Sequence, residues 1–320
     1  MAIRKNRDMG FVDAMIDGGR RTNVLLRRLD AATPWETLAE PIAALSEYTN
    51  TGPCRPTWCP VIMLKCVMLA KWFNLSDPGL EEALMDRISF RRFVGLSFTD
   101  ITPDETTFVN FRKRLREAQI HEDIFDAVVK HLDSQGFLVR EGTMVDATII
   151  EQSTGRSRGD GTSTRDQDAS FTKKHGRTYH GYKGHIACDL SGIVTDYRFT
   201  TAREHDSRHI DDLTIDERKA VIADSAYSDR SRRAELRARG VADGICYKRN
   251  RNQAALYDWQ ERFNSVVAHL RARVEHPFAM MKHQLGLRRV RYRGRQRNAF
   301  DFAITLAACN LKKSLSLREP

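Results

Sequence analysis

The stretch from residue 142 to residue 248 limits the possible folds more than any other part of the chain, because short β-branched runs follow one another there. The runs TMVDATII, YKGHIACDLSGIVTDYRFT, KAVIADSAY and DGICYK are typical of strands. The second of these sequences contains two runs, joined at Asp189 to Gly192, which predicts a hairpin. We therefore expect five strands, the first three arranged as a meander.

Helical patterns alternate with the later strands. One pattern follows Ser228 and ends at Gly240, and two longer ones run from about 258 to 283 and from 298 to 311. A meander of strands followed by alternating strands and helices favours a mixed α/β sheet covered by helices. We place this second domain at residues 139–314.

Residues 1–138 are predicted to form a separate all-α domain of five or six helices. Thr33 and Thr102 each precede a proline and stand three residues before a glutamate, which predicts a capping box at the start of two helices. In the second domain, residues 153–178 are rich in Ser, Thr, Gly and charged residues, so we expect a mobile loop there.

The chain of 320 residues has a formal net charge of +10 and a pI of about 9.4. Such a charge indicates a polyanionic partner, although basic proteins without a specific partner also exist. Nucleic acid is favoured over a membrane surface, because no segment approaches the ~20 apolar residues of a membrane span. We find no signal peptide, and the six scattered cysteines read as reduced thiols of a cytoplasmic protein.

Two aspartates stand at strand positions where aspartate is unusual. Asp146 interrupts an apolar strand and lies on the opposite face from Val145 and Ala147, where an unpaired carboxylate would be costly. Asp224 follows the strand VIA, at the end where open α/β sheets commonly bind ligands. A metal ion would explain both residues. An arginine partner for Asp146 and a simple turn at Asp224 are the alternatives.

Glu275 is the single acid between Arg271 and Arg297, among nine Lys or Arg residues. On a straight helix it lies about 40° from Arg271, and Lys282 lies about 20° from Arg271, so the three share one face. Pro277 should kink or restart this helix. An ion pair between Arg271 and Glu275 would be the ordinary explanation, worth only a few tenths of a kcal/mol.

Together, two aspartates and a glutamate could hold two Mg²⁺ or Mn²⁺ ions, about 4 Å apart, for in-line attack on a phosphodiester. Arg271 and Lys282 would hold the DNA backbone beside them. This chemistry requires acids for the metal and bases for the phosphate in one place.

These residues resemble those of an insertion-sequence DDE transposase, in the group named after insertion sequences four and five, and its insertion-sequence-five branch. The family motif Y-x2-R-x3-E-x6-K is met by Arg271, Glu275 and Lys282, whereas its tyrosine position holds Ala268. The stretches VEHPFAMMK, RVRYRG, HGYKGH and AREHDS, and PDETTFVNFRKRL near the N-terminus, are also similar to the family. The resemblance covers nearly the whole chain.

The resemblance implies a ribonuclease-H-like core and a helical N-terminal domain that helps to bind terminal inverted repeats and contributes oligomer contacts. It implies that Asp146, Asp224 and Glu275 are catalytic metal ligands for two Mg²⁺ or Mn²⁺ ions. Cleavage at the element ends and transfer into target DNA would follow, carried out by a homo-oligomer on double-stranded DNA. The expected location is the bacterial cytoplasm, with association with the nucleoid when bound to DNA.

Further basic residues are candidates for contacts with DNA. The alternating run RRVRYRGRQR predicts an extended or turn segment with arginines along a phosphate backbone. Lys183, with His185 on the same strand face, could approach DNA or be solvated, and the helix with Arg112 and Lys113 could contact DNA or only pack on its neighbours. The candidate DNA-binding residues are Arg271, Lys282, Arg288, Arg289, Arg291, Arg293, Lys183, Arg112 and Lys113.

Two other functions remain open. One is a nuclease of the same fold that cuts DNA without joining it, because hydrolysis and strand transfer use the same metals. The other is a non-catalytic DNA-binding protein derived from a transposase. The presence of all three acids disfavours this second alternative.

Overall fold

The structure is a computed structural model and describes residues 3–4, 24–49, 57–155, 164–174, 176–249 and 253–318. The chain forms two compact units, Met1–His131 with Asn310–Pro320, and Leu132–Cys309. We expected the division at 138 and 314, so both limits differ by several residues. Each observed limit falls inside a helix, α9 (Ile120–Ser134) or α13 (Arg295–Leu317), where composition gives no linker signal.

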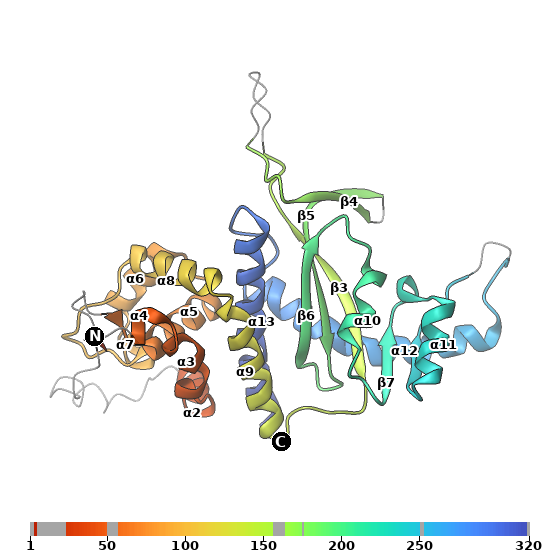
Figure 1. The fold of residues 1–320 in the computed structure, drawn as a ribbon, viewed down its shortest axis with the longest axis horizontal. Helices are drawn as coiled ribbons and strands as arrows, with labels where there is room; N and C mark the ends of the chain where they lie inside the picture. Colours follow the sequence, from red (N-terminus) through yellow and green to blue (C-terminus); the bar gives the residue numbers. More distant parts are fainter. Residues whose placement is uncertain are drawn as a thin grey trace. The chain divides into compact units, whose positions relative to one another are not determined.

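The described part of the first unit is helical apart from one short parallel pair of strands, β1 (Ile3–Arg4) and β2 (Thr57–Trp58). The all-α prediction is thus confirmed in the main, with more helices than expected because several are very short. Besides α9, these are α2 (Val24–Ala32), α3 (Trp35–Ala43), α4 (Ser46–Thr49), α5 (Pro60–Trp72), α6 (Asp77–Asp86), α7 (Ile88–Val94) and α8 (Glu105–Glu117) (Figure 1).

Helix α5 forms the centre of the first unit. Nearly all of its side chains are buried, and a helix that is apolar on every side requires neighbours all round it. Trp72 from α5 meets Trp35 and Phe93 edge to face, with ring centroids 6.2 and 5.8 Å apart. Aromatic pairs in this arrangement add about 0.5–1.5 kcal/mol each beyond the area that they bury.

The two predicted capping boxes are wrong in detail. Helix α3 begins after Pro34, which occupies the cap position that we assigned to Thr33, without a side-chain cap. Helix α8 begins after Asp104, whose carboxylate accepts a hydrogen bond of 2.6 Å from the Thr107 amide. A carboxylate one residue before the helix is a stronger acceptor for its free amides than Thr102, two residues further away.

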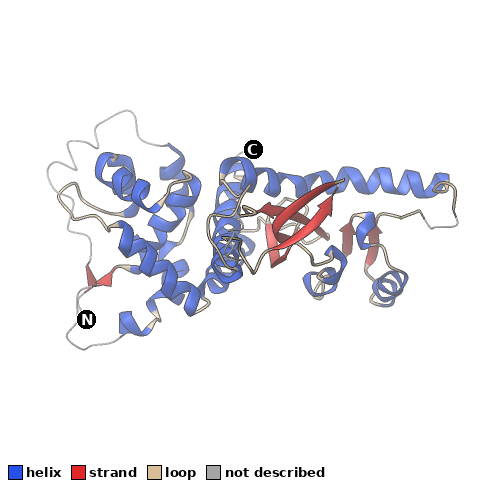
Figure 2. Cartoon of the chain, turned by 90° about the horizontal axis from the view of Figure 1, so that it is seen from above, coloured by secondary structure: helices blue, strands red, loops and turns tan. Residues whose placement is uncertain are grey.

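The second unit contains a six-stranded mixed sheet (Figure 2). Its strands are β3 (Thr143–Glu151), β4 (Ser170–Lys174), β5 (Arg177–Cys188), β6 (Val194–Thr201), β7 (Ala220–Ala223) and β8 (Ala242–Ile245). The order is β4-β5-β3-β7-β8, and β6 also pairs with β5; β5 runs antiparallel to β3, β4 and β6, while β7 and β8 run parallel to β3. The predicted mixed sheet flanked by helices is confirmed, as is the hairpin between β5 and β6.

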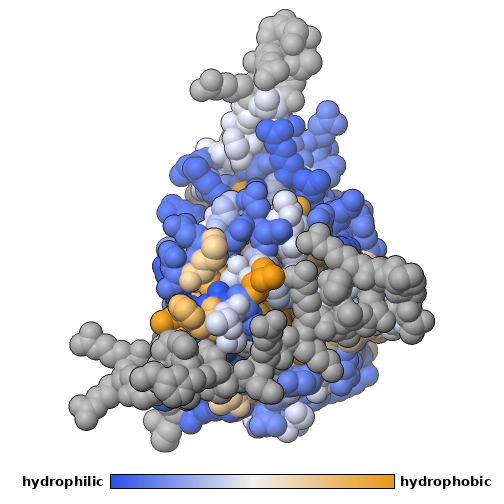
Figure 3. All heavy atoms as spheres, turned by 90° about the vertical axis from the view of Figure 1, so that its left-hand side faces the viewer, coloured by the Kyte–Doolittle hydropathy of each residue, from blue (hydrophilic) through white to orange (hydrophobic). Residues whose placement is uncertain are grey.

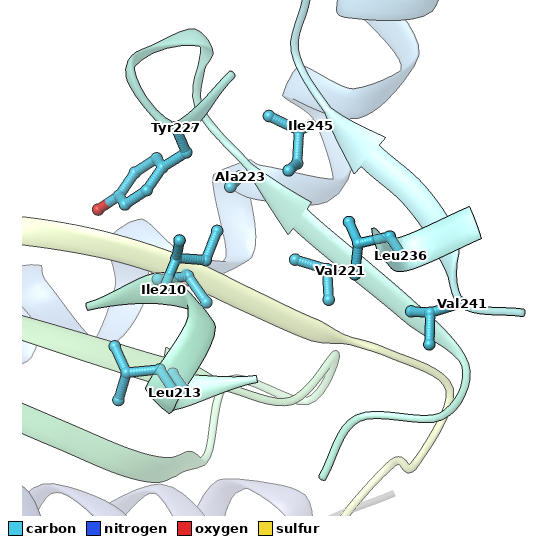
Figure 4. Close-up of a cluster of buried hydrophobic side chains, with 10 residues drawn as sticks. Ile210, Leu213, Val221, Ala223, Tyr227, Leu236, Val241 and Ile245 are labelled. Atoms are coloured by element: carbon cyan, nitrogen blue, oxygen red, sulfur yellow. The ribbon is translucent and has the colours of Figure 1, made fainter. Parts of the chain in front are cut away.

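One face of this sheet is covered by the short helix α10 (Ile210–Leu213) and by α11 (Arg230–Ala238). Figure 4 shows the buried cluster that they form with β7 and β8, including Val221, Leu236 and Ile245. The ring of Tyr227 belongs to this cluster, and its hydroxyl points away from Leu236 and Ile245. This packing fixes the position of the chain just after β7.

The other face carries α12 (Asp258–Ala279) and α13. A Cβ atom on Gly184 of β5 would lie 2.4 Å from the ring of Phe302 in α13, so the glycine lets the helix approach the sheet closely. Because Phe302 is fully buried, this contact is part of the core of the second unit.

Part of the predicted loop at 153–178 is ordered, contrary to expectation. Residues Ser170–Lys174 form β4, which pairs with the first residues of β5. Within the same segment, Asp166 is buried and accepts hydrogen bonds from the hydroxyl of Tyr182, at 2.8 Å, and from the amide of Gly294, at 2.9 Å. A polar composition therefore concealed both a strand and a buried carboxylate. Residues 156–163 and 175 lie outside the described residues.

Pro277 does not interrupt α12, contrary to expectation. The helix continues to Ala279 and passes into a π-helical turn, η3 (Met280–Gln284), whose closing hydrogen bond runs from the Leu285 amide to the Met280 carbonyl at 3.1 Å. Such π turns are frequent at functional sites. The irregular turn thus follows Glu275 and contains Lys282.

Figure 3 shows one face of the molecule, on which the described residues are mostly hydrophilic with a few scattered apolar side chains. Isolated apolar residues of this kind are normal on a protein surface. Within the described ranges, no helix has the length and the apolar character needed to cross a bilayer.

Candidate active site

The register of the sheet brings Asp146 and Asp224 side by side. Strand β7 runs parallel to β3 with Ala223 opposite Val145, and each aspartate is the next residue along its strand. Asp146 lies opposite Ile186 of β5 and therefore on the face that α12 covers, while Asp224 begins the short turn η2 (Ser225–Tyr227). The two residues come from positions 78 apart in the sequence, yet the strand pairing alone makes them neighbours.

Arg271 of α12 joins the two aspartates. Its Nη2 atom lies 3.3 Å from Oδ2 of Asp146 and 3.8 Å from Oδ2 of Asp224. The second carboxylate oxygen of Asp146 accepts the amide of Ala147 at 2.8 Å. One guanidinium thus faces two carboxylates, so the arginine partner considered as an alternative for Asp146 exists, and it also serves Asp224.

The electrostatics of Asp146 show that one arginine does not offset its surroundings. Burial raises the pKa of the Asp146 carboxyl, and the negative charge of Asp224 adds to the rise. The hydrogen bond from Ala147 and the charges of Arg271 and Lys174 act in the opposite direction without cancelling it. A further cation beside this pair would stabilise its charged form.

Glu275 is not part of this cluster. It lies one helical turn after Arg271, is exposed, and makes no hydrogen bond or ion pair with any residue in the described part of the chain. The ion pair with Arg271 that we considered is thus not formed, because the guanidinium faces the aspartates. Among the residues described, no three His, Cys, Asp or Glu side chains form a metal-binding group.

Lys282 lies in the π turn, and the charge of Asp146 is one of those that act on its ammonium. Burial lowers the pKa of its ammonium, and the cations Lys174 and Arg288 lower it further, while Glu151 and Asp146 raise it. The sequence predicted a helical position for Lys282, and the residue lies in the π turn that continues α12. The lowered pKa means that a neighbouring anion would be needed to stabilise the ammonium fully.

The arginine segment, residues 288–293, pairs with the last residue of β3, Glu151. The amide of Val290 donates to the carbonyl of Glu151 at 2.9 Å, and the amide of Glu151 donates to the carbonyl of Arg288 at 3.3 Å. The side chains of Arg288, Arg289, Arg291 and Arg293 are all exposed. The prediction of an extended or turn segment is therefore confirmed for residues 288–293, which lie outside any helix.

Lys183 was predicted to approach DNA, and the structure places it elsewhere. It lies opposite Ile149 in the sheet, on the face away from Asp146, with a side chain only 12% exposed. Its Nζ atom lies 2.8 Å from Asp206 and donates to the carbonyl of Glu204 at 2.7 Å. The ammonium is thus neutralised inside the protein, and this prediction is wrong because strand alternation alone did not reveal which face carries the site.

His185 lies on the same face of β5 as Lys183, away from Asp146. It is fully buried, its Nε2 atom lies 2.9 Å from the hydroxyl of Thr200, and its ring stands 4.7 Å from the ring of His209. Burial, with the charge of His209, lowers its pKa well below the ordinary range. It is a neutral residue of the fold.

Arg112 and Lys113 of α8 have different surroundings. The guanidinium of Arg112 forms an ion pair with Asp77 at the start of α6, and only 12% of its side chain is exposed. Lys113 is 60% exposed and lies 3.9 Å from Glu117 one turn later. Arg112 therefore connects two helices of the first unit, and only Lys113 presents a cation to solvent.

Tyr227 was missed in the sequence. It is 1% exposed, and its hydroxyl has no hydrogen-bond partner among the described residues. Burial raises its pKa, and the charges of Asp146, Asp206 and Asp224 raise it further. An unpaired buried hydroxyl is unusual, and the charges of both aspartates of the site act on this one. The only signal was its place three residues after Asp224, in the stretch DSAY.

The chain matches two models of protein families. Residues 138–311 match the family described as "Transposase DDE domain", and residues 14–114 match the family described as "Transposase domain (DUF772)". The first match covers more than half of the chain and contains Asp146, Asp224, Arg271 and Glu275.

Two solved structures are also similar to the chain. One is the piggyBac transposase synaptic complex with hairpin DNA, at 10% identity over 93% of this chain and 75% of that chain, with a TM-score of 0.47. The other is the Mos1 strand transfer complex, at 13% identity over 83% of this chain and 78% of that chain, with a TM-score of 0.28.

Proposed function

The chain belongs to the family of transposases with a DDE domain, and from this premise we propose that it is an insertion-sequence enzyme of the group named after insertion sequences four and five. It binds the terminal inverted repeats of its element, cleaves the element ends and joins them to target DNA. The observation that supports this most is the meeting of Asp146 and Asp224 at one cation.

The donor set suits a hard divalent cation. Mg²⁺ and Mn²⁺ prefer carboxylate oxygens, and two aspartates with a single guanidinium between them carry an excess of negative charge. Asp146 and Asp224 would hold such an ion, and we assign Glu275 as the third ligand of a two-ion site. When bound, the ions would polarise the phosphodiester and lower the pKa of the attacking water or 3′-hydroxyl.

The remaining side chains of the site act on the DNA. Arg271 holds the two carboxylates in one orientation, and its charge would bind the phosphate near the cleaved end. Lys282, which is partly buried in the π turn, would gain a stabilising anion when a phosphate enters. The exposed Arg288, Arg289, Arg291 and Arg293 would follow the backbone away from the site.

We assign recognition of the element ends, and contacts between copies, to the first unit. Its solvent-exposed Lys113 is a residue of α8 from which a contact with DNA can be tested. Lys113→Glu should reduce the preference for an inverted repeat over unrelated DNA in a competition binding assay. An unchanged preference would contradict this role.

A nuclease that cuts without joining is the second candidate, since the same two aspartates serve hydrolysis and transfer. A strand-transfer assay separates the two functions. The assay contains purified protein, Mg²⁺ or Mn²⁺, a plasmid target and pre-cut ends that carry the inverted repeats bracketing the reading frame. A transposase should give joined product. Cleavage without joined product would overturn the transposase assignment and favour the nuclease.

The role of Glu275 has a matched control on the same helix. Glu275→Gln should abolish cleavage while DNA binding remains measurable, because the change removes one metal-ligand charge and keeps the shape. Glu261 is also exposed on α12, and Glu261→Gln should cleave at the wild-type rate. Equal rates for the two variants would reject Glu275 as a ligand.

A further inference from the structure

The β4–β5 hairpin extends beyond the rest of the sheet. Strand β5 pairs with β3 only from Gly181 onward and with β6 only from Tyr182 onward. Residues 177–181 of β5 pair with β4, in the register Lys174 opposite Arg177 and Phe171 opposite His180. A two-stranded ribbon thus projects past the end of β3, at the upper edge of the sheet in Figure 1.

The direction of this ribbon is fixed at its base. Gly181 has a φ of +155°, and a Cβ atom there would lie 2.2 Å from the carbonyl of Ile150, so only glycine allows the chain to pass. The amide of Gln152 donates to the carbonyl of His180 at 2.8 Å, and the amide of Arg203 donates to the hydroxyl of Ser170 at 2.7 Å. The ribbon is therefore attached to the sheet on both of its strands.

The ribbon carries only positive charge. Residues 170–181 include Lys173, Lys174 and Arg177 and no acid. All three cations are exposed, and in the described ranges none of them pairs with a carboxylate. Lys174 and Arg177 stand directly opposite each other, an arrangement of like charges that destabilises a pair of strands. A negatively charged partner would remove this repulsion.

The base of the ribbon adjoins the exposed arginine segment 288–293, because Gly181 and Arg289 both pair with Glu151 at the end of β3. The charge of Lys174 lowers the pKa of Asp146, and it lowers the pKa of Lys282 as well. Strand alternation puts Lys174, Arg177 and Tyr179 on one face of the ribbon.

We propose that Lys174 and Arg177 form a phosphate-binding clamp that holds the DNA backbone against the site of Asp146 and Asp224. The proposal rests on the proposed function, because it takes DNA as the ligand. Two adjacent exposed cations without acidic partners suit the phosphates of one strand. The packing of the Arg177 guanidinium over the ring of Tyr179, 5.3 Å away, holds one of them in place.

The test is a binding measurement with a matched control. The double variant Lys174→Gln with Arg177→Gln removes two charges from the ribbon. The control, Arg218→Gln with Lys219→Gln, removes two exposed charges just before β7, at the end of that strand remote from Asp224. Binding of the full-length protein to a mixed-sequence DNA duplex is measured at several salt concentrations, and circular dichroism checks the fold of each variant.

Each lost phosphate contact reduces the slope of log K against log salt by about 0.9, so the hairpin variant should lose about 1.8 while the control keeps the wild-type slope. The double variant Lys174→Arg with Arg177→Lys should also keep it. An unchanged slope in the hairpin variant, with normal binding by the wild type, would reject the clamp and leave the proposed function standing. Equal losses in both glutamine variants would reject it too. Absence of binding by the wild type would remove the proposed function itself.

Discussion

Arg271 reaches from α12 to within 3.3 Å of the carboxylate of Asp146, and this contact connects the helix to the centre of the sheet. Asp146 is partly buried, with a side chain 25% exposed, so its charge depends in part on this partner. Arg271→Gln should lower the free energy of unfolding by about 1–3 kcal/mol, the cost of leaving a buried polar group without its partner. Urea denaturation measures the change.

Arg262→Gln is the control for this prediction, because Arg262 is exposed on the same helix and has no ion pair with a described residue. Its stability should stay within about 0.5 kcal/mol of the wild type. Mg²⁺ should stabilise Arg271→Gln more than the wild type, since an ion that binds the folded state replaces the lost charge. Equal losses in the two variants would show that Arg271 does not support Asp146.

The pH dependence of Asp146→Asn follows from the sign of the pKa shift. The folded state holds the carboxyl pKa above its ordinary value of 3.8, so ionisation of Asp146 disfavours folding. This penalty is absent below pH 3.8 and develops as the pH rises through the folded-state pKa. The stability of Asp146→Asn relative to the wild type should therefore increase from acid to neutral pH. A constant difference in urea midpoints across this range would contradict the shift.

The hydroxyls of Tyr227 and Tyr182 should contribute differently to stability. Since the hydroxyl of Tyr227 has no partner among the described residues, Tyr227→Phe should be as stable as the wild type or more stable. The hydroxyl of Tyr182 donates to Asp166 at 2.8 Å, so Tyr182→Phe should lose about 1–3 kcal/mol. Thermal unfolding compares the two. A larger loss at Tyr227 would show that its hydroxyl is satisfied in solution.

Gly184→Ala tests the packing of α13 on the sheet. The added methyl group would meet the ring of Phe302 at 2.4 Å, which should cost about 1–3 kcal/mol through overpacking. The smaller side chain of Phe302→Leu should recover part of that loss in the double variant, although it is destabilising alone. Additive losses would show that the two residues do not share a contact.

The sequence predicted the features that depend on local periodicity. The strands, the hairpin at Asp189, the two aspartates and the helix with Arg271 all follow from patterns within a few residues of each other. The target of Arg271 was not predictable, because it depends on the parallel register of β3 and β7, which places Val145 opposite Ala223 although three other strands lie between them in the sequence. An i,i+4 partner such as Glu275 is visible in sequence, whereas the pairing of distant strands is not.

The stretch HGYKGH is a second case in which the sequence did not reveal what the side chains contact. The shared strand face of Lys183 and His185 suggested that they could approach DNA, yet Lys183 is only 12% exposed and His185 is buried, both on the face away from Asp146. Gly184 leaves room for the ring of Phe302, and the hydroxyl of Tyr182 donates to Asp166. Gly181 lets the chain pass close to the Ile150 carbonyl. Strand alternation groups residues by face and does not say which face carries the site, so their structural roles required the fold.

Metal-dependent strand transfer by aspartate variants tests most directly whether Asp146 and Asp224 form one catalytic metal site. Asp216 is exposed, lies before β7 and has no partner among the described residues, so Asp216→Asn is a matched control. Asp146→Asn and Asp224→Asn should each lose Mn²⁺ binding by at least about tenfold, a change of about 1.4 kcal/mol, and should give no joined product. Asp216→Asn should retain both activities. Wild-type Mn²⁺ affinity and joined product in either of the first two variants would contradict this assignment.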